Sequence, residues 1–173
     1  MDPTLVNRIA AHLAGTKFVL ASAESIKLTE AQLGFALPEL LKSLYLNIAN
    51  GGFGPGYGII GIAGGHRSSI GSLVETYNDM IRGAQYLGLE WNPRCLPICD
   101  WGDSIYSCVD CATPGNPILR SDECKAHPVN YGLEDFFEMW LEGRDLFSDG
   151  APKARTVEII NPFTGKKTRV KSR

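Results

Sequence analysis

Hydrophobic residues recur at a spacing of three to four positions in four segments of the chain, and this spacing predicts a helix in each. The segments are residues 2–15, 38–51, 70–88 and 133–147. In the first segment Asp2 offers an N-cap before Pro3, and the second segment begins with Pro38. Proline suits a helix start because the backbone N–H at that position has no partner within the helix. The last segment has a broad apolar stripe with acidic residues opposite, so we expect it to pack inward and expose acid.

A fifth, shorter helix is predicted from a capping pattern rather than from a hydrophobic stripe. Thr29 and Gln32 stand three residues apart, so that each side chain can bond the other residue's free backbone N–H. Gly34 suits the end of this helix, because glycine readily adopts the left-handed conformation found there.

Short runs of β-branched and aromatic residues predict strands between the helices. Residues 94–101 and 104–111 flank Gly102-Asp103, which favours a hairpin turn, and Ile118-Leu119 fits a third strand. Residues 57–63 predict a further strand inside a glycine-rich loop. Helices together with hairpin-connected strands indicate an α+β fold.

The charge of the chain changes sign near residue 152. Residues 1–152 carry ten Lys and Arg against 18 Asp and Glu, whereas residues 153–173 carry seven basic residues and one acidic residue. In the basic segment, alternating polar and apolar residues on both sides of a turn at 161–165 predict a hairpin. We therefore divide the 173 residues into one domain, 1–152, and a basic C-terminal hairpin, 153–173, attached to it.

This charge asymmetry bears on the partners. An acidic body repels nucleic acid and attracts a basic protein. The basic hairpin could contact phosphate or fold back on the acidic surface of its own chain.

The compartment is predicted from what the sequence lacks. No apolar run approaches the about 20 residues that cross a membrane, and residues 1–20 show no secretory leader. We therefore expect a cytoplasmic protein without a membrane partner, whose five cysteines are reduced thiols.

One group of side chains has the spacing of a metal site. Cys108 and Cys111 form one pair, Cys124 and His127 form another, and twelve residues separate the pairs, as in many tetrahedral zinc sites. However, residues 104–111 are predicted to be a strand, in which residues three apart point to opposite faces. We expect no cofactor and keep a zinc-stabilised interaction module as the alternative.

Three other patterns give no support to catalysis. A Cys–His pair lacks any neighbour that would lower a thiol pKa. The glycines at 52–58 follow a helix and precede a strand, the reverse of a nucleotide-binding loop. Asp100, Asp103 and Asp110 suit turns in a hairpin. We therefore expect no catalytic residues and no enzyme activity.

Several short motifs follow one another in a characteristic order. The leucine–proline start of residues 37–45 is followed by Asn50-Gly51-Gly52, and Leu96-Pro97-Ile98 leads into Trp101-Gly102-Asp103. An aromatic helix at residues 133–141 closes the series. From residue 24 to residue 147, this order and spacing resemble the SUKH superfamily, which includes yeast cell-wall-assembly regulators and many bacterial immunity proteins.

The resemblance implies both a fold and a function. The fold would be α+β, with a mixed, largely antiparallel sheet flanked by helices, used as a non-catalytic scaffold for binding protein. The function would be that of an immunity protein that neutralises a cognate bacterial toxin, and the acidic body favours a basic toxin domain. The partner-binding residues that we predict are Trp101, Asp103, Glu134, Glu138 and Glu142.

Overall fold

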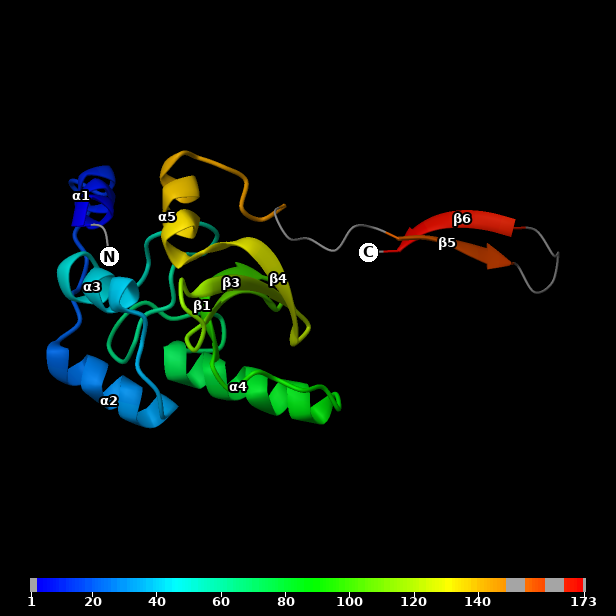
Figure 1. Ribbon diagram of the computed structural model, residues 1–173, viewed down its shortest axis with the longest axis horizontal. Helices are drawn as coiled ribbons and strands as arrows, with labels where there is room; N and C mark the ends of the chain where they lie inside the picture. Colours follow the sequence, from blue (N-terminus) through cyan, green and yellow to red (C-terminus); the bar gives the residue numbers. More distant parts are fainter. Residues whose placement is uncertain (1–2, 149–154, 161–166, 173) are drawn as a thin grey trace.

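The computed structural model describes residues 3–148, 155–160 and 167–172 (Figure 1). The described helices are α1 (Pro3–His12), α2 (Ala23–Leu33), α3 (Glu39–Asn47), α4 (Leu73–Tyr86) and α5 (Leu133–Leu141). The described strands are β1 (Cys95–Gly102), β2 (Ile105–Asp110), β3 (Pro117–Asp122), β4 (Lys125–Gly132), β5 (Arg155–Ile160) and β6 (Lys167–Ser172). None of the described helices is long and apolar enough to cross a membrane.

Strands β1 to β4 form one sheet in the order in which they occur along the chain, and each pairs antiparallel with its neighbour. Together with the helices, this sheet confirms the α+β fold class. Among the described strands the sheet is antiparallel throughout, because each connection between consecutive strands is short enough to reverse the chain directly.

Two of these connections are tight turns built without glycine at their centre. Asp103 and Ser104, between β1 and β2, have φ angles of 49° and 61°, and Glu123 and Cys124, between β3 and β4, have 47° and 61°. Two consecutive positive φ angles characterise the type I′ turn, whose twist matches that of the flanking strands. Side chains other than Asn and Asp are disfavoured at these angles, so both turns carry some backbone strain.

The substitution Ser104→Gly is therefore expected to raise the free energy of unfolding by about 0.5–1 kcal/mol, because glycine adopts positive φ without strain. Urea denaturation measures the change. Ser104→Ala removes the hydroxyl but retains the strained Cβ, so it should give no gain. An equal gain from both variants would mean that the hydroxyl, rather than the backbone angle, is unfavourable.

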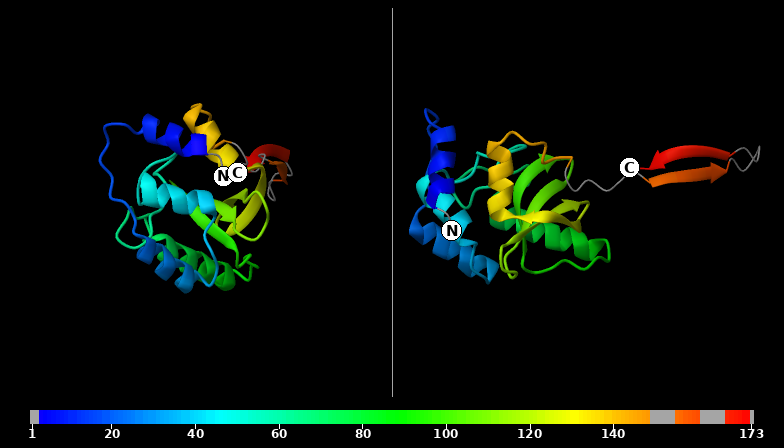
Figure 2. Two further views of the ribbon diagram at one scale, coloured as in Figure 1. Left: turned by 60° about the vertical axis from the view of Figure 1, so that its left-hand side comes forward. Right: turned by 45° about the horizontal axis from the view of Figure 1, so that its top comes forward.

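Helices cover both faces of the sheet (Figures 1 and 2). Helix α4 contacts β1 and α2 on one side, and α5 contacts β3, β4 and α1 on the other. The core between these layers includes fully buried residues of α3, α5 and the sheet, among them Leu41, Leu44, Phe136, Phe137 and Val109. The apolar stripes predicted for residues 38–51 and 133–147 thus face the core as expected.

The glycine-rich loop between α3 and α4 is organised by Asn50, which is 4% exposed. Its side-chain Oδ1 accepts a hydrogen bond from the Ile62 N–H at 2.9 Å, and its Nδ2 donates to the Ala63 carbonyl at 3.3 Å. A Cβ on Gly65 would collide with the Asn50 backbone carbonyl, so glycine is needed for this close approach. The loop is therefore folded onto the end of α3 by one buried side chain.

The strand predicted at residues 57–63 is reduced to a single antiparallel bridge between Ile59 and Cys99. The Ile60 N–H donates to the Ile98 carbonyl at 2.8 Å, and the Tyr57 N–H donates to the Asp100 carbonyl at 2.8 Å. The loop thus runs along the outer edge of β1 and covers part of it. It forms no longer ladder because its next residues turn back toward Asn50.

A second correction concerns α2, which begins at Ala23 and not at Thr29. Ser22 is its N-cap, with the Ser22 hydroxyl accepting from the Ser25 N–H at 3.0 Å. Thr29 lies within the helix, 2% exposed, and donates to the Ser25 carbonyl at 2.8 Å. The helix does end at Gly34, whose φ of 78° is left-handed as predicted.

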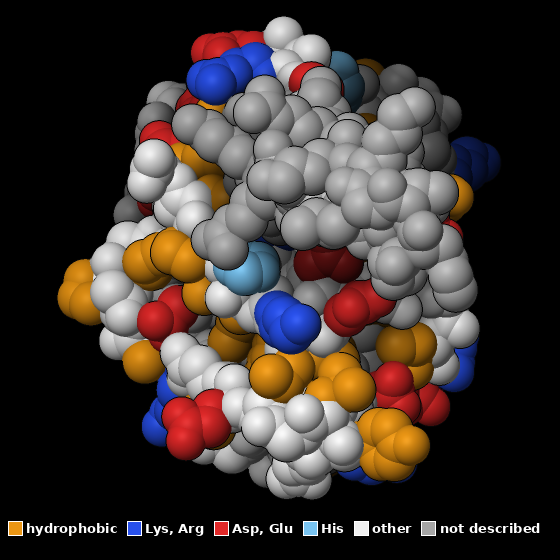
Figure 3. Space-filling model, turned by 90° about the vertical axis from the view of Figure 1, so that its right-hand side faces the viewer, with side chains coloured by type: hydrophobic (Ala, Val, Ile, Leu, Met, Phe, Trp, Pro, Cys, Tyr) orange, Lys and Arg blue, Asp and Glu red, His pale blue; other side chains and the backbone are white. Residues whose placement is uncertain are grey.

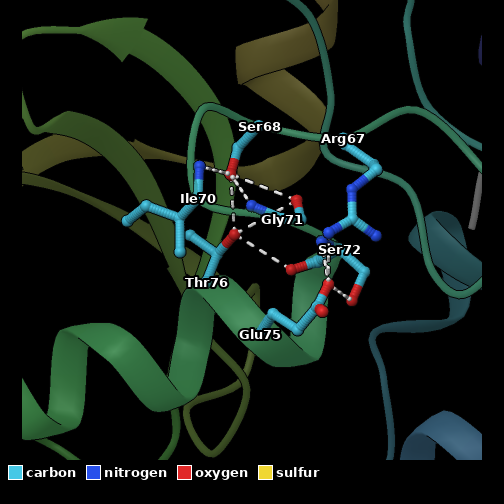
Figure 4. A network of polar contacts seen from close by, with 7 residues as sticks. All are labelled: Arg67, Ser68, Ile70, Gly71, Ser72, Glu75 and Thr76. Carbon is cyan, nitrogen blue, oxygen red and sulfur yellow. Dashed lines mark hydrogen bonds and ion pairs between the residues drawn. The ribbon is translucent and has the colours of Figure 1, made fainter.

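Helix α4 begins in a network of polar contacts (Figure 4). The N–H and hydroxyl groups of Ser72 both donate to Glu75 Oε2 at 2.7 Å, and Arg67 lies 3.2 Å from the same oxygen. The hydrogen bonds from Ser72, more than the charge of Arg67, hold the pKa of the Glu75 carboxyl below its ordinary value. The cap explains why the helix starts at Leu73, three residues after the start of the predicted pattern.

Strands β5 and β6 pair only with each other in a second, two-stranded sheet. The predicted C-terminal hairpin is therefore present, although its turn at 161–166 lies outside the described residues. Figures 1 and 2 draw it to one side of the four-stranded sheet. The division into a 1–152 domain and an attached hairpin stays a prediction.

Candidate functional site

A groove of about 590 Å³ lies between the outer strand β4 and helix α5. Residues 128–131 of β4 form one wall, and the other is formed by Asp135, Glu138, Met139 and Glu142, with Arg144 also contributing. Three carboxylates against one guanidinium give this lining a net charge of −2. We call it the acidic groove.

The sequence of α5 explains why acid gathers here. Asp135, Glu138 and Glu142 are three and four residues apart, a spacing that places them on one face of a helix. Phe136 and Phe137 occupy the other side and are fully buried. Their packing in the core directs the three carboxylates toward the groove.

Helix α1 contributes a contact at the same face of α5. The Arg8 guanidinium lies 2.6 Å from one carboxylate oxygen of Glu138 and donates a hydrogen bond of 2.8 Å to the other. Because both side chains are partly exposed, this ion pair adds little to stability. It does fix the direction of the Glu138 side chain within the groove.

The structure brings only some of the predicted partner-binding residues together. Glu138 and Glu142 line the acidic groove. Glu134 is exposed and lines a separate hollow of about 420 Å³ that also includes Glu39 and Asn116. Asp135 lines both hollows. The acidic surface predicted from the sequence is therefore continuous along α5 but faces two hollows.

Trp101 and Asp103 line neither of these hollows. The Trp101 indole N–H donates to the Ser107 hydroxyl at 2.9 Å, and its ring lies 5.7 Å from that of Phe147. Asp103 is exposed in the β1–β2 turn. Trp101 is thus engaged within its own chain, and a role for either residue in binding stays a prediction.

The structure does not assemble the predicted zinc ligands. Cys108 is fully buried on β2, whereas His127 is exposed on β4, two strands away. In the part of the chain that the structure describes, no three His, Cys, Asp or Glu side chains are placed to hold a metal ion. The sequence spacing suggested a zinc site because it does not show on which strand, and on which face of the sheet, each of the four residues lies.

The five cysteines are all free thiols, and Cys95, Cys99 and Cys108 are fully buried. Burial raises the pKa of Cys99 and of Cys108, and the nearby Cys95 thiol adds to the effect at Cys108. Burial likewise raises the pKa of Cys111 to about 12. A raised pKa leaves a thiol protonated at neutral pH, so these side chains act as small apolar groups of the core.

Asp100 is the one carboxylate of the β1–β2 hairpin that is buried, at 3% exposure. Its Oδ2 accepts from the N–H and hydroxyl of Ser69 at 3.1 and 3.3 Å, and its Oδ1 accepts from the Gly102 N–H at 2.8 Å. These contacts attach the loop before α4 to the end of β1. The side chain therefore has a structural role.

Sequence reasoning missed several residues of the groove. Strand β4 was not predicted, because residues 125–132 show no regular alternation of apolar and polar side chains and contain Pro128. Arg8 gave no signal, since its contact with Glu138 joins residues 130 positions apart. Asp135 could have been found, because it shares the helical spacing of Glu138 and Glu142.

Comparison with known proteins agrees with this architecture. The model of the SMI1 / KNR4 family (SUKH-1) matches residues 20–140, a range that spans α2 to α5 and includes all four strands of the main sheet. A search of curated proteins found no match to the chain. Proteins of the matched family are in general not catalytic and act through protein–protein interaction. Because the match covers more than half of the chain and follows the motif order seen in the sequence, the chain belongs to the SMI1 / KNR4 family (SUKH-1) of the SUKH superfamily.

Proposed function

We propose that the protein is a non-catalytic immunity protein of the cytoplasm, which neutralises a cognate bacterial toxin by binding a basic segment of it in the acidic groove. The observation that carries the proposal is the groove itself, with carboxylates from Asp135, Glu138 and Glu142 above the outermost strand of the sheet. Membership in a family of protein-binding domains supports it.

The groove can supply both affinity and selectivity for a basic partner. Pro128 and Val129 offer apolar surface, while the carboxylates surround it with negative charge. Apolar contact at the centre of an interface provides most of the binding free energy, and charged groups around it speed encounter and exclude acidic competitors. Glu138 is already held in place by Arg8, so ordering its side chain adds little to the entropic cost of binding.

The substitution Glu142→Lys is expected to weaken binding of the toxin domain about 10–100-fold, because it places a positive charge against a basic partner. Glu142 follows the last turn of α5, where the helix dipole favours positive charge, so the variant should fold normally. Isothermal titration with the cognate toxin domain, to be sought among the products of neighbouring genes, measures the change. Growth of cells that co-express the toxin should fall in parallel.

Glu90→Lys is the matched control. Glu90 is exposed and lies outside the acidic groove, and its substitution by lysine changes the net charge by the same amount as Glu142→Lys. Equal losses from the two substitutions would show that only the overall charge matters, and no loss from Glu142→Lys would exclude the groove as the binding site.

A further inference from the structure

A hollow of about 370 Å³ lies just past the end of helix α3 and shares no residue with the acidic groove. Three short stretches line it, residues 17–19 between α1 and α2, residues 50–52 after α3, and residues 64–66 before α4. The left view of Figure 2 shows the connection between α1 and α2 running along the outside of the molecule. Four of the nine lining residues are glycines, so we call this site the glycine hollow.

Asn50 joins the three stretches through its backbone. Its N–H donates to the Val19 carbonyl at 2.6 Å, and its carbonyl accepts from the His66 N–H at 2.8 Å. Its buried side chain also bonds the loop at Ile62 and Ala63. The walls of the glycine hollow are therefore fixed before a ligand arrives, which lowers the entropic cost of binding.

The lining of the glycine hollow has a positive charge and no negative one. Lys17 is exposed, and none of the nine lining residues is Asp or Glu. The face shown in Figure 3 differs, because its described part places Lys or Arg side chains close to Asp or Glu side chains. The glycine hollow therefore favours an anion locally, although residues 1–152 are acidic as a whole.

Two backbone N–H groups of the lining have no hydrogen-bond acceptor. Within the described residues, neither the Gly51 N–H nor the Gly64 N–H forms a hydrogen bond, although the N–H groups of the next residues, Gly52 and Gly65, both donate to carbonyls. Gly51 is buried, and buried N–H groups nearly always have an acceptor. The acceptor must then come from outside the described chain, as a water molecule or as an anion.

Helix α3 supplies a simpler explanation for Lys17 alone. The helix ends at Asn47, and the negative end of a helix dipole favours a cation nearby. This effect gives no reason for the unpaired N–H groups. It also gives no reason for the exposed apolar side chains beside them.

Apolar side chains complete the lining. Phe18 and Val19 both line the glycine hollow, and Val19 is 70% exposed. Leu20, the next residue along the chain, is 52% exposed. A smaller hollow of about 200 Å³ shares Phe18 and includes Leu13 and Ile48. The site therefore suits an anion that has an apolar group attached, rather than inorganic phosphate.

We propose that the glycine hollow binds the C-terminal carboxylate of another polypeptide whose last residue is apolar. The carboxylate accepts from the unpaired N–H groups of Gly51 and Gly64 beside the Lys17 ammonium, and the last side chain packs on Phe18 and Val19. Backbone N–H groups in a concave loop are a recurring means of capturing a C-terminal carboxylate. A C-terminal residue has its carboxylate and its side chain on one Cα, so both reach a hollow of this size together.

Fluorescence polarisation of labelled peptides with the full-length protein tests the proposal. Four hexapeptides that differ only in a last residue of alanine, valine, leucine or phenylalanine are each made with a free C-terminus and as the C-terminal amide. At least one free peptide should bind with a Kd of about 10–100 μM. Its amide should bind at least about tenfold more weakly, because it lacks the charge that strengthens the hydrogen bonds.

Lys17→Glu should weaken binding of the free peptide at least about tenfold, because it places a negative charge beside the carboxylate. Lys17 is exposed, so this variant should fold normally. Lys27→Glu is the matched control, since Lys27 is exposed, lies outside the glycine hollow and gives the same change of net charge. The control should change the Kd less than about twofold.

Nuclear magnetic resonance of the wild-type protein gives an independent readout. The amide signals of Gly51 and Gly64 should shift with the free peptide, and less with its amide or with inorganic phosphate at the same concentration. Equal binding of free and amidated peptides would overturn the proposal, and so would no binding by any of the four free peptides at about 1 mM. Equal shifts with inorganic phosphate would overturn the assignment to a peptide C-terminus. The proposed function does not depend on these results, because Glu142→Lys tests a separate surface.

Discussion

Replacing Asn50 with alanine is expected to lower the free energy of unfolding by about 2–4 kcal/mol. The Asn50 side chain bonds the Ile62 N–H at 2.9 Å and the Ala63 carbonyl at 3.3 Å, and Ile62 is fully buried. Alanine would leave both backbone groups without a partner, and a buried polar group without a partner costs about 1–3 kcal/mol. The loop along β1 would lose the side chain that folds it back.

Urea denaturation measures this loss, and Asn47→Ala is its control. Asn47 is exposed on α3, and its amide also donates to a backbone carbonyl, that of Ser43, at 2.8 Å. Water can replace this exposed bond, so the control should lose less than about 1 kcal/mol. Similar losses from both variants would contradict the structural role that we give to Asn50.

Alkaline pH is expected to destabilise the protein steeply because of its buried thiols. Cys99 and Cys108 are fully buried, and burial raises the pKa of each above the ordinary thiol value. As the pH rises above about 8.5, the unfolded chain releases these protons while the folded protein retains them. Their contribution to stability is therefore complete below that pH and is lost progressively above it, with a slope approaching about 1.4 kcal/mol per pH unit for each thiol.

Urea denaturation between about pH 8 and pH 10, with a reductant present, measures this slope. The variant Cys99→Ala/Cys108→Ala lacks both titrating thiols. Its free energy of unfolding should therefore fall less steeply with pH than that of the wild-type protein, by up to about 2.7 kcal/mol per pH unit. Tyr77, Cys111 and Cys124, whose pKa values burial also raises, remain in both proteins. Equal slopes would show that these two thiols titrate alike in the folded and unfolded states.

The spacing of hydrophobic residues correctly predicted the helices that have one side against the core and the other side at the surface. The leucine helix α3 and the aromatic helix α5 each bury one side against the core, and this leaves a regular period in the sequence. Strands β1 and β2 bury consecutive residues instead, and they were predicted from β-prone residues on both sides of the Gly102-Asp103 turn. The order and spacing of the motifs around Asn50 and Trp101 identified the superfamily, because these motifs are short and can be read directly from the sequence. The start of α2 was misplaced because Thr29 and Gln32 mimic a capping box, although the helix is capped by Ser22.

The groove was less predictable, because contacts between distant parts of the chain create it. The acidic face of α5 was visible from the spacing of its glutamates. Its opposite wall, β4, has irregular burial because one edge and one face of the strand lie at the surface. Strand pairing determined the outcome for the cysteines, since it kept Cys108 on β2 away from His127 on β4. The contact of Trp101 with Phe147 was not visible because the two residues are far apart in the sequence.

The two edge strands of the main sheet, β1 and β4, lack the features of an aggregation-prone edge. Hydrogen bonds from Tyr57 and Ile60 close part of the β1 margin, and on the β4 margin Pro128 lacks the N–H that an added strand would need. Copies of this protein that meet in a crowded cell therefore find no uninterrupted row of backbone donors and acceptors on either margin. We expect recognition of other molecules to proceed through side chains rather than by extension of the sheet, and concentrated solutions to remain free of fibrils.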